Sequence, residues 1–278
     1  MKVGVIGAGV MGTGVSQRFA QFGHNIYLVD KLSVKLDEAE KNIERNLMLD
    51  NMFGKTKCDV KQVLSRIEFS TTYDGIVDCD VVIENVSEII SVKEVVYKKL
   101  AEVVNKNCII LANTSCISIT QLGALTHRPE MVIGSHFMNP VPKQDFAEVI
   151  QGFYTSDKTI KRTEELLSGV GIVCTVVNDS PGFVSNRISH LMMNEAANLV
   201  MENVATPEQI DMVFTNGFHH ETGPLHTADL IGIDTVVHSL EVLYDCYQDS
   251  KFRCSPLLKK MVYAGLLGQK TGEGFFKY

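Results

Sequence analysis

The sequence predicts an α/β protein with a doubly wound, largely parallel sheet, followed by an all-helical C-terminal domain. A glycine-rich turn joins two apolar strands within residues 1–30. Apolar segments rich in β-branched residues then alternate with helical segments to about residue 150, which is the pattern of parallel βαβ units. Beyond residue 182 only helical patterns follow. We therefore expect two domains, over residues 1–182 and 183–278.

The size and composition of the chain limit its possible functions. Its 278 residues are enough for two modest domains with buried cores. The formal net charge of −7 argues against a nucleic-acid partner, which would need a basic surface. The chain starts directly in a strand rather than a targeting leader, and no apolar run approaches the roughly 18 residues of a membrane helix. Seven cysteines without a C-x-x-C pair fit a reducing compartment. We expect a soluble, cytoplasmic protein without a membrane partner.

The first element is a dinucleotide-binding fingerprint in its full context. The segment KVGVIGAGVMGTGVSQRFAQFGHNIYLVD reads as a strand, a glycine turn, a helix and a second strand that ends in acid. Gly7 permits the tight turn, Gly9 lets the backbone approach a pyrophosphate, and Gly12 allows the helix to pack closely on the strand. Asp30 can accept hydrogen bonds from the adenosine ribose, and its charge disfavours a 2′-phosphate. The segment therefore predicts a Rossmann-like fold that binds NAD.

Residues 34–65 interrupt this alternation and predict a helical insertion. Apolar residues recur there at helical spacing, at Leu36, Ala39, Ile43, Leu47 and Phe53. Gly54 then breaks the pattern, and CDVKQVLSRI resumes it.

Five further strands follow the insertion, each a short apolar segment. They are expected at RIEFS, DVVIE, CIILAN, MVIGSHF and FAEVIQG. Ligands of doubly wound sheets bind at the carboxyl ends of the strands. Glu84, Asn113, Ser115 and His136 lie at or just beyond such ends. We expect these side chains to converge on one crevice, with Asn113 among the cofactor-binding residues.

An acid/base site is indicated by His136 and Glu148 on neighbouring predicted strands. A histidine near neutral pH can take a proton from an alcohol while hydride leaves the same carbon. Glu148 can hold the second ring nitrogen and stabilise the imidazolium. Ser115 and Asn186 add short polar groups that can contact the reacting oxygen, although either could instead cap a helix. Cys116 beside Ser115 fits packing better than nucleophilic catalysis.

The last third of the chain reads as helices separated by glycine and proline signals. They are expected over residues 184–204, 206–218, 227–247 and 256–268, and Thr206-Pro207 is a typical helix start. The helices are apolar, and Met192, Met193 and Met201 fit a core or a subunit contact. A homodimer is therefore favoured over a self-contained bundle.

These motifs together resemble the short-chain L-3-hydroxyacyl-CoA dehydrogenases, of the bacterial 3-hydroxybutyryl-CoA dehydrogenase type. The resemblance extends over the chain, through GAGVMGTG, SHFMNPVP, SPGFVSNR, GPLHTADLIGID and GLLGQKTGEGFFKY. It implies an NAD-binding domain joined to a helical substrate and dimerisation domain. The family's catalytic serine, histidine, glutamate and asparagine fall on Ser115, His136, Glu148 and Asn186. Its cofactor-contacting glutamate and lysine fall on Glu88 and Lys93.

The resemblance implies NAD-dependent oxidation of a short-chain 3-hydroxyacyl-CoA to the 3-ketoacyl-CoA in fatty acid metabolism, or the reverse reduction. Lys55 and Lys57 are candidates for binding the nucleotide part of the CoA substrate, although surface lysines are more often only solvated. Adjacent His219 and His220 do not by themselves indicate a metal site, and hydride transfer to NAD needs none, so we expect no metal.

Several positions depart from the pattern that the family commonly has. Lys143, Gln144 and Asp145 follow NPVP where apolar residues and a lysine are common, Ile89 follows Glu88, and HHET stands at 219–222. If these positions line the acyl or carrier region, the pocket is unusually polar.

Two alternatives to the CoA substrate remain. The protein could oxidise a 3-hydroxyacyl group, such as glyceryl, on an acyl carrier protein for polyketide extender units. It could also bind NAD without catalysis, as a structural or sensing protein, which the complete set of four polar residues argues against.

Overall fold

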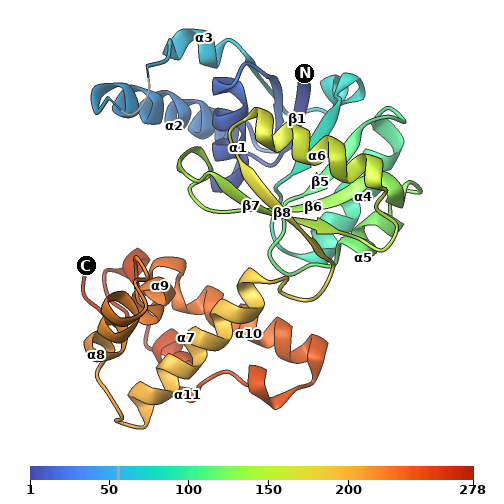
Figure 1. Cartoon of the computed structure of the whole chain (residues 1–278). Coiled ribbons are helices and arrows are strands. Elements are labelled where there is room, and N and C mark those ends of the chain that lie inside the picture. The colour runs from blue at the N-terminus through green and yellow to red at the C-terminus, as the bar shows by residue number, and fades with distance from the viewer. Residues whose placement is uncertain (55–56) are drawn as a thin grey trace. The chain divides into compact units, whose positions relative to one another are not determined.

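The computed structural model describes residues 1–54 and 57–278, which form two compact units, Met1–Asp179 and Ser180–Tyr278 (Figure 1). The boundary expected from the sequence, after residue 182, falls a few residues later. The first unit holds the sheet and the second is helical.

The first unit is built on a single sheet with the strand order β3-β2-β1-β4-β5-β6-β7-β8. The described strands are β1 (Lys2–Ile6), β2 (Asn25–Val29), β3 (Ile67–Ser70), β4 (Val81–Glu84), β5 (Ile109–Ala112), β6 (Val132–Phe137), β7 (Phe146–Gln151) and β8 (Val173–Asn178). Every pairing is parallel except that of β6 with β7. The predicted doubly wound, largely parallel fold is confirmed.

Helices connect these strands. In the described residues they are α1 (Val10–Gln21), α2 (Ser33–Met52), α3 (Val60–Leu64), α4 (Ile90–Val103), α5 (Ile119–Ala124) and α6 (Asp157–Gly169). Short 3₁₀ turns lie at η1 (Asp74–Asp78), η2 (Pro129–Met131) and η3 (Val141–Lys143). Figure 1 shows α2 and α3 as the predicted excursion between β2 and β3.

The apolar spacing of the insertion fixes which face of α2 is buried, with one exception. Leu36, Ala39, Ile43 and Leu47 are buried in the main core of the first unit. Phe53 was expected to continue this stripe, which is wrong, because its side chain is 66% exposed. The helix ends at Met52, and Gly54 turns the chain with a φ of +68°.

Strand β8 has no counterpart among the strands that we predicted. It lies at the edge of the sheet and pairs only with β7 in the described residues. None of its residues is fully buried, so it lacks the apolar run that identifies the central strands. Its signal in the sequence is correspondingly weak.

The second unit consists of helices around its own apolar core. They are α7 (Ser185–Met201), α8 (Pro207–Met212), α9 (Pro224–Ile231), α10 (Ile233–Tyr247) and α11 (Pro256–Tyr263), with short turns at η4 (Val213–Gly217), η5 (Ser250–Phe252) and η6 (Gln269–Thr271). Thr206 caps α8 through a capping box with Gln209, as its sequence indicated. The helix expected over 227–247 is divided, because Gly232 has a φ of +103° between α9 and α10.

A buried carboxylate in the second unit has backbone partners. Asp229 is fully buried, and its carboxylate accepts hydrogen bonds from the backbone N–H groups of Phe275 and Phe276, each at 2.9 Å. This carboxylate ties the C-terminal segment to α9.

Of the methionines expected in a core or a subunit contact, Met193 is buried in the core of the unit, whereas Met201 is 41% exposed.

Within residues 1–54 and 57–278, none of the helices combines the length and the apolar character that crossing a membrane requires.

One arginine of α1 holds the segment that connects β6 to β7. The Arg18 side chain is 10% exposed and donates to the backbone oxygens of Val170, Gly171 and Pro142 at 2.8, 2.8 and 3.2 Å. It also donates to the Asp145 carboxylate at 2.8 Å. Asp145, one of the departures from the family pattern, is therefore engaged with α1.

We expect Arg18→Met to lower the free energy of unfolding by about 3 kcal/mol, because several buried acceptors lose their charged donor. Asp145→Ala should cost less than about 1 kcal/mol, since its side chain is 75% exposed and an exposed ion pair contributes little. Urea denaturation of both variants measures the difference. Equal losses would show that the carboxylate, rather than the three carbonyl groups, is the main partner of Arg18.

Candidate active site

The turn between β1 and α1 contains glycines at positions where a side chain would collide. Gly7 has a φ of +98°, and an added Cβ would lie 2.8 Å from the carbonyl oxygen of Asn85. A Cβ at Gly12 would collide with the carbonyl oxygen of Gly7. At Gly9, by contrast, it would meet no described atom within 4 Å. The backbone of Gly9 thus faces open space at the N-terminus of α1, where an anionic group can approach.

Asp30 follows β2, and its carboxylate holds this turn in place. Oδ2 accepts a hydrogen bond from the backbone N–H of Ala8 at 2.9 Å, and Oδ1 accepts one from Leu32 at 3.0 Å. Each carboxylate oxygen can accept more than one hydrogen bond. Asp30 is therefore placed to accept ribose hydroxyl groups while it orders the glycine turn.

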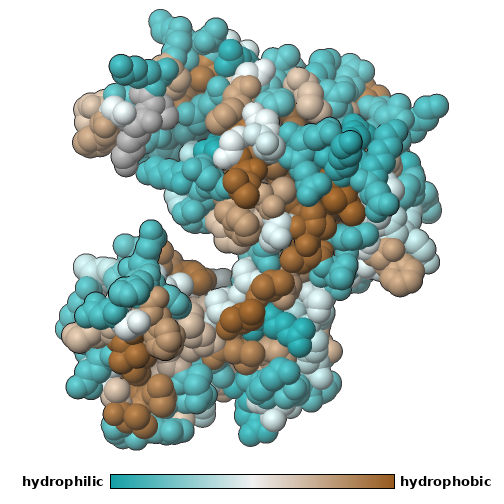
Figure 2. Space-filling model, in the orientation of Figure 1, coloured by the Kyte–Doolittle hydropathy of each residue, from teal (hydrophilic) through white to brown (hydrophobic). Residues whose placement is uncertain are grey.

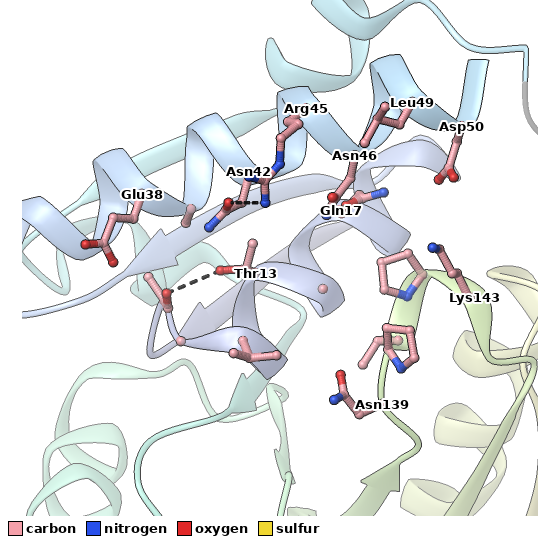
Figure 3. A pocket seen from close by; sticks show the side chains of 18 of the residues that line it. Thr13, Gln17, Glu38, Asn42, Arg45, Asn46, Leu49, Asp50, Asn139 and Lys143 are labelled. Atoms are coloured by element: carbon pink, nitrogen blue, oxygen red, sulfur yellow. Dashed lines mark hydrogen bonds between the residues drawn. The ribbon is translucent and has the colours of Figure 1, made fainter. Parts of the chain in front are cut away.

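A cavity of about 460 Å³ lies between α1, α2 and η3 (Figure 3). Its charged lining residues are Lys35, Glu38, Arg45, Asp50 and Lys143. Gln17 also lines it and is fully buried, and its Oε1 accepts a hydrogen bond from Asn46 at 3.4 Å. In the described part of the chain, Gln17 Nε2 has no hydrogen-bond partner. The amide is thus a buried donor at the wall of a cavity that begins beside Gly9.

His136 lies between a carboxylate and a hydroxyl group. The antiparallel register of β6 and β7 places His136 directly opposite Glu148, and His136 Nδ1 is 3.1 Å from Glu148 Oε2. Ser115 follows β5, and its Oγ is 3.2 Å from His136 Nε2. The side chains of His136 and Glu148 are 12% and 3% exposed. An ionised Glu148 favours the tautomer with the proton on Nδ1, which leaves Nε2 to accept a proton.

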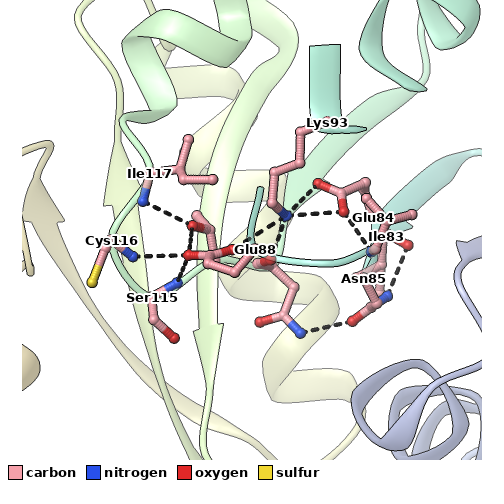
Figure 4. A network of polar contacts seen from close by, with 11 residues as sticks. Ile83, Glu84, Asn85, Glu88, Lys93, Ser115, Cys116 and Ile117 are labelled. Carbon is pink, nitrogen blue, oxygen red and sulfur yellow. Dashed lines mark hydrogen bonds and ion pairs between the residues drawn. The ribbon is translucent and has the colours of Figure 1, made fainter. Parts of the chain in front are cut away.

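A second polar network joins the ends of β4 and β5 (Figure 4). Lys93 Nζ is buried and lies 2.8 and 2.9 Å from the two carboxylate oxygens of Glu84. Burial raises the pKa of Glu84, and the Lys93 charge opposes that rise. Lys93 also donates to the backbone oxygen of Asn113 at 3.0 Å, and the Asn113 side chain donates to Asn85 Oδ1 at 2.7 Å. Glu88 approaches the same lysine at 3.6 Å.

The structure brings together most of the expected site residues, with three exceptions. Asn186 belongs to the second unit, where it lies in the first turn of α7 and its backbone oxygen is 2.9 Å from His190 Nδ1. Lys57 is exposed and is not among the described residues that line the cavity. Lys55 lies outside the described residues. The roles of these three residues, like those of the other site residues, stay predictions.

Gln17 and the charged residues of the cavity were not predicted from the sequence. A signal was nevertheless present, because Gly9, Thr13 and Gln17 recur every four residues along α1 and so share one helix face. Two polar residues on a buried face that begins at the glycine turn indicate a cavity or a ligand.

Comparisons with known proteins identify the family. Residues 2–180 match the NAD binding domain of 3-hydroxyacyl-CoA dehydrogenase, and residues 182–278 match its C-terminal domain. The chain belongs to the 3-hydroxyacyl-CoA dehydrogenase family. The resemblance inferred from the sequence is thus confirmed. A 3-hydroxyacyl-CoA dehydrogenase is an NAD-dependent oxidoreductase that acts on a CH–OH group, so the predicted enzyme class and cofactor are confirmed as well.

Relatives from this family match along the whole length of the chain. A probable 3-hydroxybutyryl-CoA dehydrogenase of Deinococcus radiodurans is 46% identical over 278 residues, which is 100% of each chain. A 3-hydroxybutyryl-CoA dehydrogenase of Clostridioides difficile is 40% identical and is covered over 99% of its length. The crystal structure of (S)-3-hydroxybutyryl-CoA dehydrogenase from Ralstonia eutropha has a TM-score of 0.95 at 41% identity and covers 100% of this chain and 98% of that one.

The residues of the turn fit the NAD of a 3-hydroxyacyl-CoA dehydrogenase. The open space at Gly9 would be filled by a Cβ, and the Asp30 carboxylate stands at the end of the next strand. These two features would suit the pyrophosphate and the adenosine ribose of a dinucleotide.

We expect Gly9→Ala to weaken NADH binding and Gly12→Ala to lower the stability of the fold. Gly9→Ala should melt close to the wild type yet bind NADH at least about tenfold more weakly, because the methyl group occupies space that the fold leaves open. Gly12→Ala should lower stability by about 1–3 kcal/mol through its collision with Gly7. NADH fluorescence titration and thermal unfolding measure the two effects. Wild-type NADH affinity in Gly9→Ala would exclude this turn as the pyrophosphate site.

Proposed function

We propose that the protein oxidises the 3-hydroxyl group of a short-chain 3-hydroxyacyl-CoA with NAD, or catalyses the reverse reduction. Relatives named 3-hydroxybutyryl-CoA dehydrogenase at 40–46% identity support this substrate class. The observation that carries the proposal is the placement of His136 between Glu148 and Ser115. A histidine held in this way can act as the acid/base group for an alcohol and a ketone.

The proton is handled by His136 in this proposal. Bound NAD supplies the acceptor for the hydride of the substrate. His136 Nε2 takes the hydroxyl proton of the substrate and returns it to the ketone oxygen in the reverse direction. Glu148 faces Nδ1 at 3.1 Å, so it orients the ring and stabilises the imidazolium that forms. The largely buried setting of the pair strengthens this stabilisation.

Ser115 and Asn186 are proposed to hold the substrate oxygen. Ser115 Oγ lies 3.2 Å from His136 Nε2, so a substrate oxygen that contacts one of these atoms is within reach of the other. Hydrogen bonds that strengthen as charge develops on that oxygen would favour the transition state. Asn186 is assigned to the same role on the match of SPGFVSNR to the family motif.

The polar residues that depart from the family pattern give only limited support to an acyl carrier protein as the carrier of the acyl group. Asp145 is engaged by Arg18, so it is not available to shape an acyl pocket. Lys143 and Gln144 are exposed, as are residues 219–222, and could contact a carrier protein. The relatives named 3-hydroxybutyryl-CoA dehydrogenase support CoA as the carrier. We therefore favour CoA and retain glyceryl-carrier oxidation as the alternative.

We expect His136→Ala to lower kcat/KM for 3-hydroxybutyryl-CoA by about 10²- to 10⁴-fold, because the acid/base group is lost. NADH should bind with wild-type affinity, since His136 is placed to meet the substrate. Absorbance of NADH follows turnover and fluorescence titration measures binding. His127→Asn is the matched control, because His127 is exposed and Asn tolerates its left-handed φ of 56°.

The wild type should be assayed in parallel with short 3-hydroxyacyl groups, including glyceryl, on an acyl carrier protein. Turnover of the CoA ester supports the leading proposal, and turnover on the carrier protein alone supports the alternative. A wild type that binds NADH and turns over neither substrate would support a non-catalytic NAD-binding protein.

We also propose that the protein is a homodimer that associates through its helical unit. Figure 2 shows apolar side chains at the surface of this unit, and the exposed ones include Val204, Met212, Val213, Phe218 and Leu230. Clusters of exposed apolar side chains mark contact surfaces in many proteins.

Light scattering during gel filtration should therefore give a mass of twice 30.8 kDa at micromolar concentrations. A mass that stays at 30.8 kDa as the concentration rises would contradict the dimer.

A further inference from the structure

The segment that carries Ser115 is attached to a single carboxylate oxygen. Glu88 lies just before α4, and its Oε1 accepts hydrogen bonds from the backbone N–H groups of Ser115 at 2.8 Å and Cys116 at 3.0 Å. The Thr114 hydroxyl donates to the same oxygen. Thr114 Oγ1 in turn accepts a hydrogen bond from the backbone N–H of Ile117 at 3.0 Å. Residues 114–117 are thus ordered around Glu88 Oε1 (Figure 4).

The other oxygen of Glu88 faces a buried cation. Glu88 Oε2 is 3.6 Å from Lys93 Nζ, and the Lys93 side chain is fully buried. The hydrogen bonds of that ammonium go to Glu84 and to the backbone oxygen of Asn113. An ammonium has three N–H donors, which these acceptors occupy. Lys93 therefore faces Glu88 as an ion-pair partner, while its hydrogen bonds go to Glu84 and Asn113.

These contacts connect Lys93 to the catalytic histidine. Lys93 is fixed between the ends of β4 and β5, and its ammonium lies 3.6 Å from Glu88 Oε2. Glu88 in turn accepts hydrogen bonds from the Ser115 and Cys116 amides and so fixes this part of the chain. Ser115 Oγ then stands 3.2 Å from His136 Nε2. Short polar side chains on a connecting segment need such anchoring, since a free segment would sample several positions.

We propose that Glu88, held by Lys93, is the positioning residue that places Ser115 opposite His136. This inference rests on the proposed function of Ser115 and goes beyond a contact of Glu88 and Lys93 with the cofactor, which the family resemblance implies. The two roles change different quantities. A cofactor contact contributes to NAD affinity, whereas a positioning residue contributes to kcat.

The first test compares Glu88→Ala with Glu88→Gln. Glu88→Ala should lower kcat by about 10- to 100-fold, because a displacement of about 1 Å at a reacting group can cost about a hundredfold. The NADH dissociation constant should change by less than about threefold. Glu88→Gln keeps an oxygen acceptor for the amides of Ser115 and Cys116, so it should restore most of the lost kcat.

A double-mutant cycle with Ser115→Ala tests whether Glu88 acts through Ser115. If it does, Glu88→Ala should lower kcat by less than about threefold once Ser115 is already alanine. Losses that multiply in the double variant would overturn the proposal. So would a Glu88→Ala variant that binds NADH more weakly at an unchanged kcat. Glu102→Ala is the matched control, because it breaks an exposed ion pair with Lys99 on α4 and should leave kcat unchanged.

A readout that needs no turnover separates this proposal from the proposed function. Amide hydrogen exchange at Ser115 and Cys116 should accelerate at least about tenfold in Glu88→Ala and stay slow in Glu88→Gln and Glu102→Ala. Unchanged exchange in Glu88→Ala would show that Glu88 does not hold the segment, whatever the enzyme oxidises. A wild type without activity on any thioester, but with this exchange pattern, would refute the proposed function and keep the anchoring role of Glu88.

Discussion

The antiparallel pairing of β6 with β7 is the constraint on which the candidate active site depends. It places Glu148 directly opposite His136 in a sheet whose other pairings are parallel. The connection, residues 138–145, is shorter than the dozen or so residues that a parallel crossover needs. Arg18 then holds this connection to α1 through Pro142 and Asp145. The helix that begins at the glycine turn thus also supports the segment beside the proposed acid/base pair.

We infer that the buried charges of Lys93 and Glu84 position the residues of the site rather than stabilise the fold. Removing Lys93 and Glu84 from water costs several kcal/mol per ion, which their mutual attraction offsets only when the geometry is good. The pair has that geometry, with two distances below 3 Å and a further bond to the Asn113 backbone. The pair joins the ends of β4 and β5, and so it fixes the start of the segment that carries Ser115. A buried hydrophobic pair could stabilise the sheet as well, but it could not orient Glu88.

Local sequence patterns predicted the parts of the structure that depend on neighbouring residues. The glycine turn, the buried face of α2 and the cap at Thr206 each follow from short-range spacing. The pairing of the strands that carry His136 and Glu148 was predictable because consecutive strands usually pair. The antiparallel direction that sets the two residues opposite each other was not predicted. Contacts between distant segments were not predictable in this way. Nothing near Asp145 indicates its ion pair with Arg18, and nothing near Glu88 shows that its acceptors serve the Ser115 amide. Strand β8 and the break at Gly232 depend on an edge position and on one backbone angle.

The tautomer of His136 tests the proposed acid/base chemistry most directly. If Glu148 fixes the proton on Nδ1, then Nε2 is left to accept the proton of the substrate. Nitrogen-15 NMR of the histidine side chains distinguishes the two ring nitrogens, and a Glu148→Gln variant assigns the signal. We predict that the neutral form of the His136 ring carries its proton on Nδ1 in the wild type. A ring with its proton on Nε2 would contradict this chemistry, because the atom that faces Ser115 could then not act as the base.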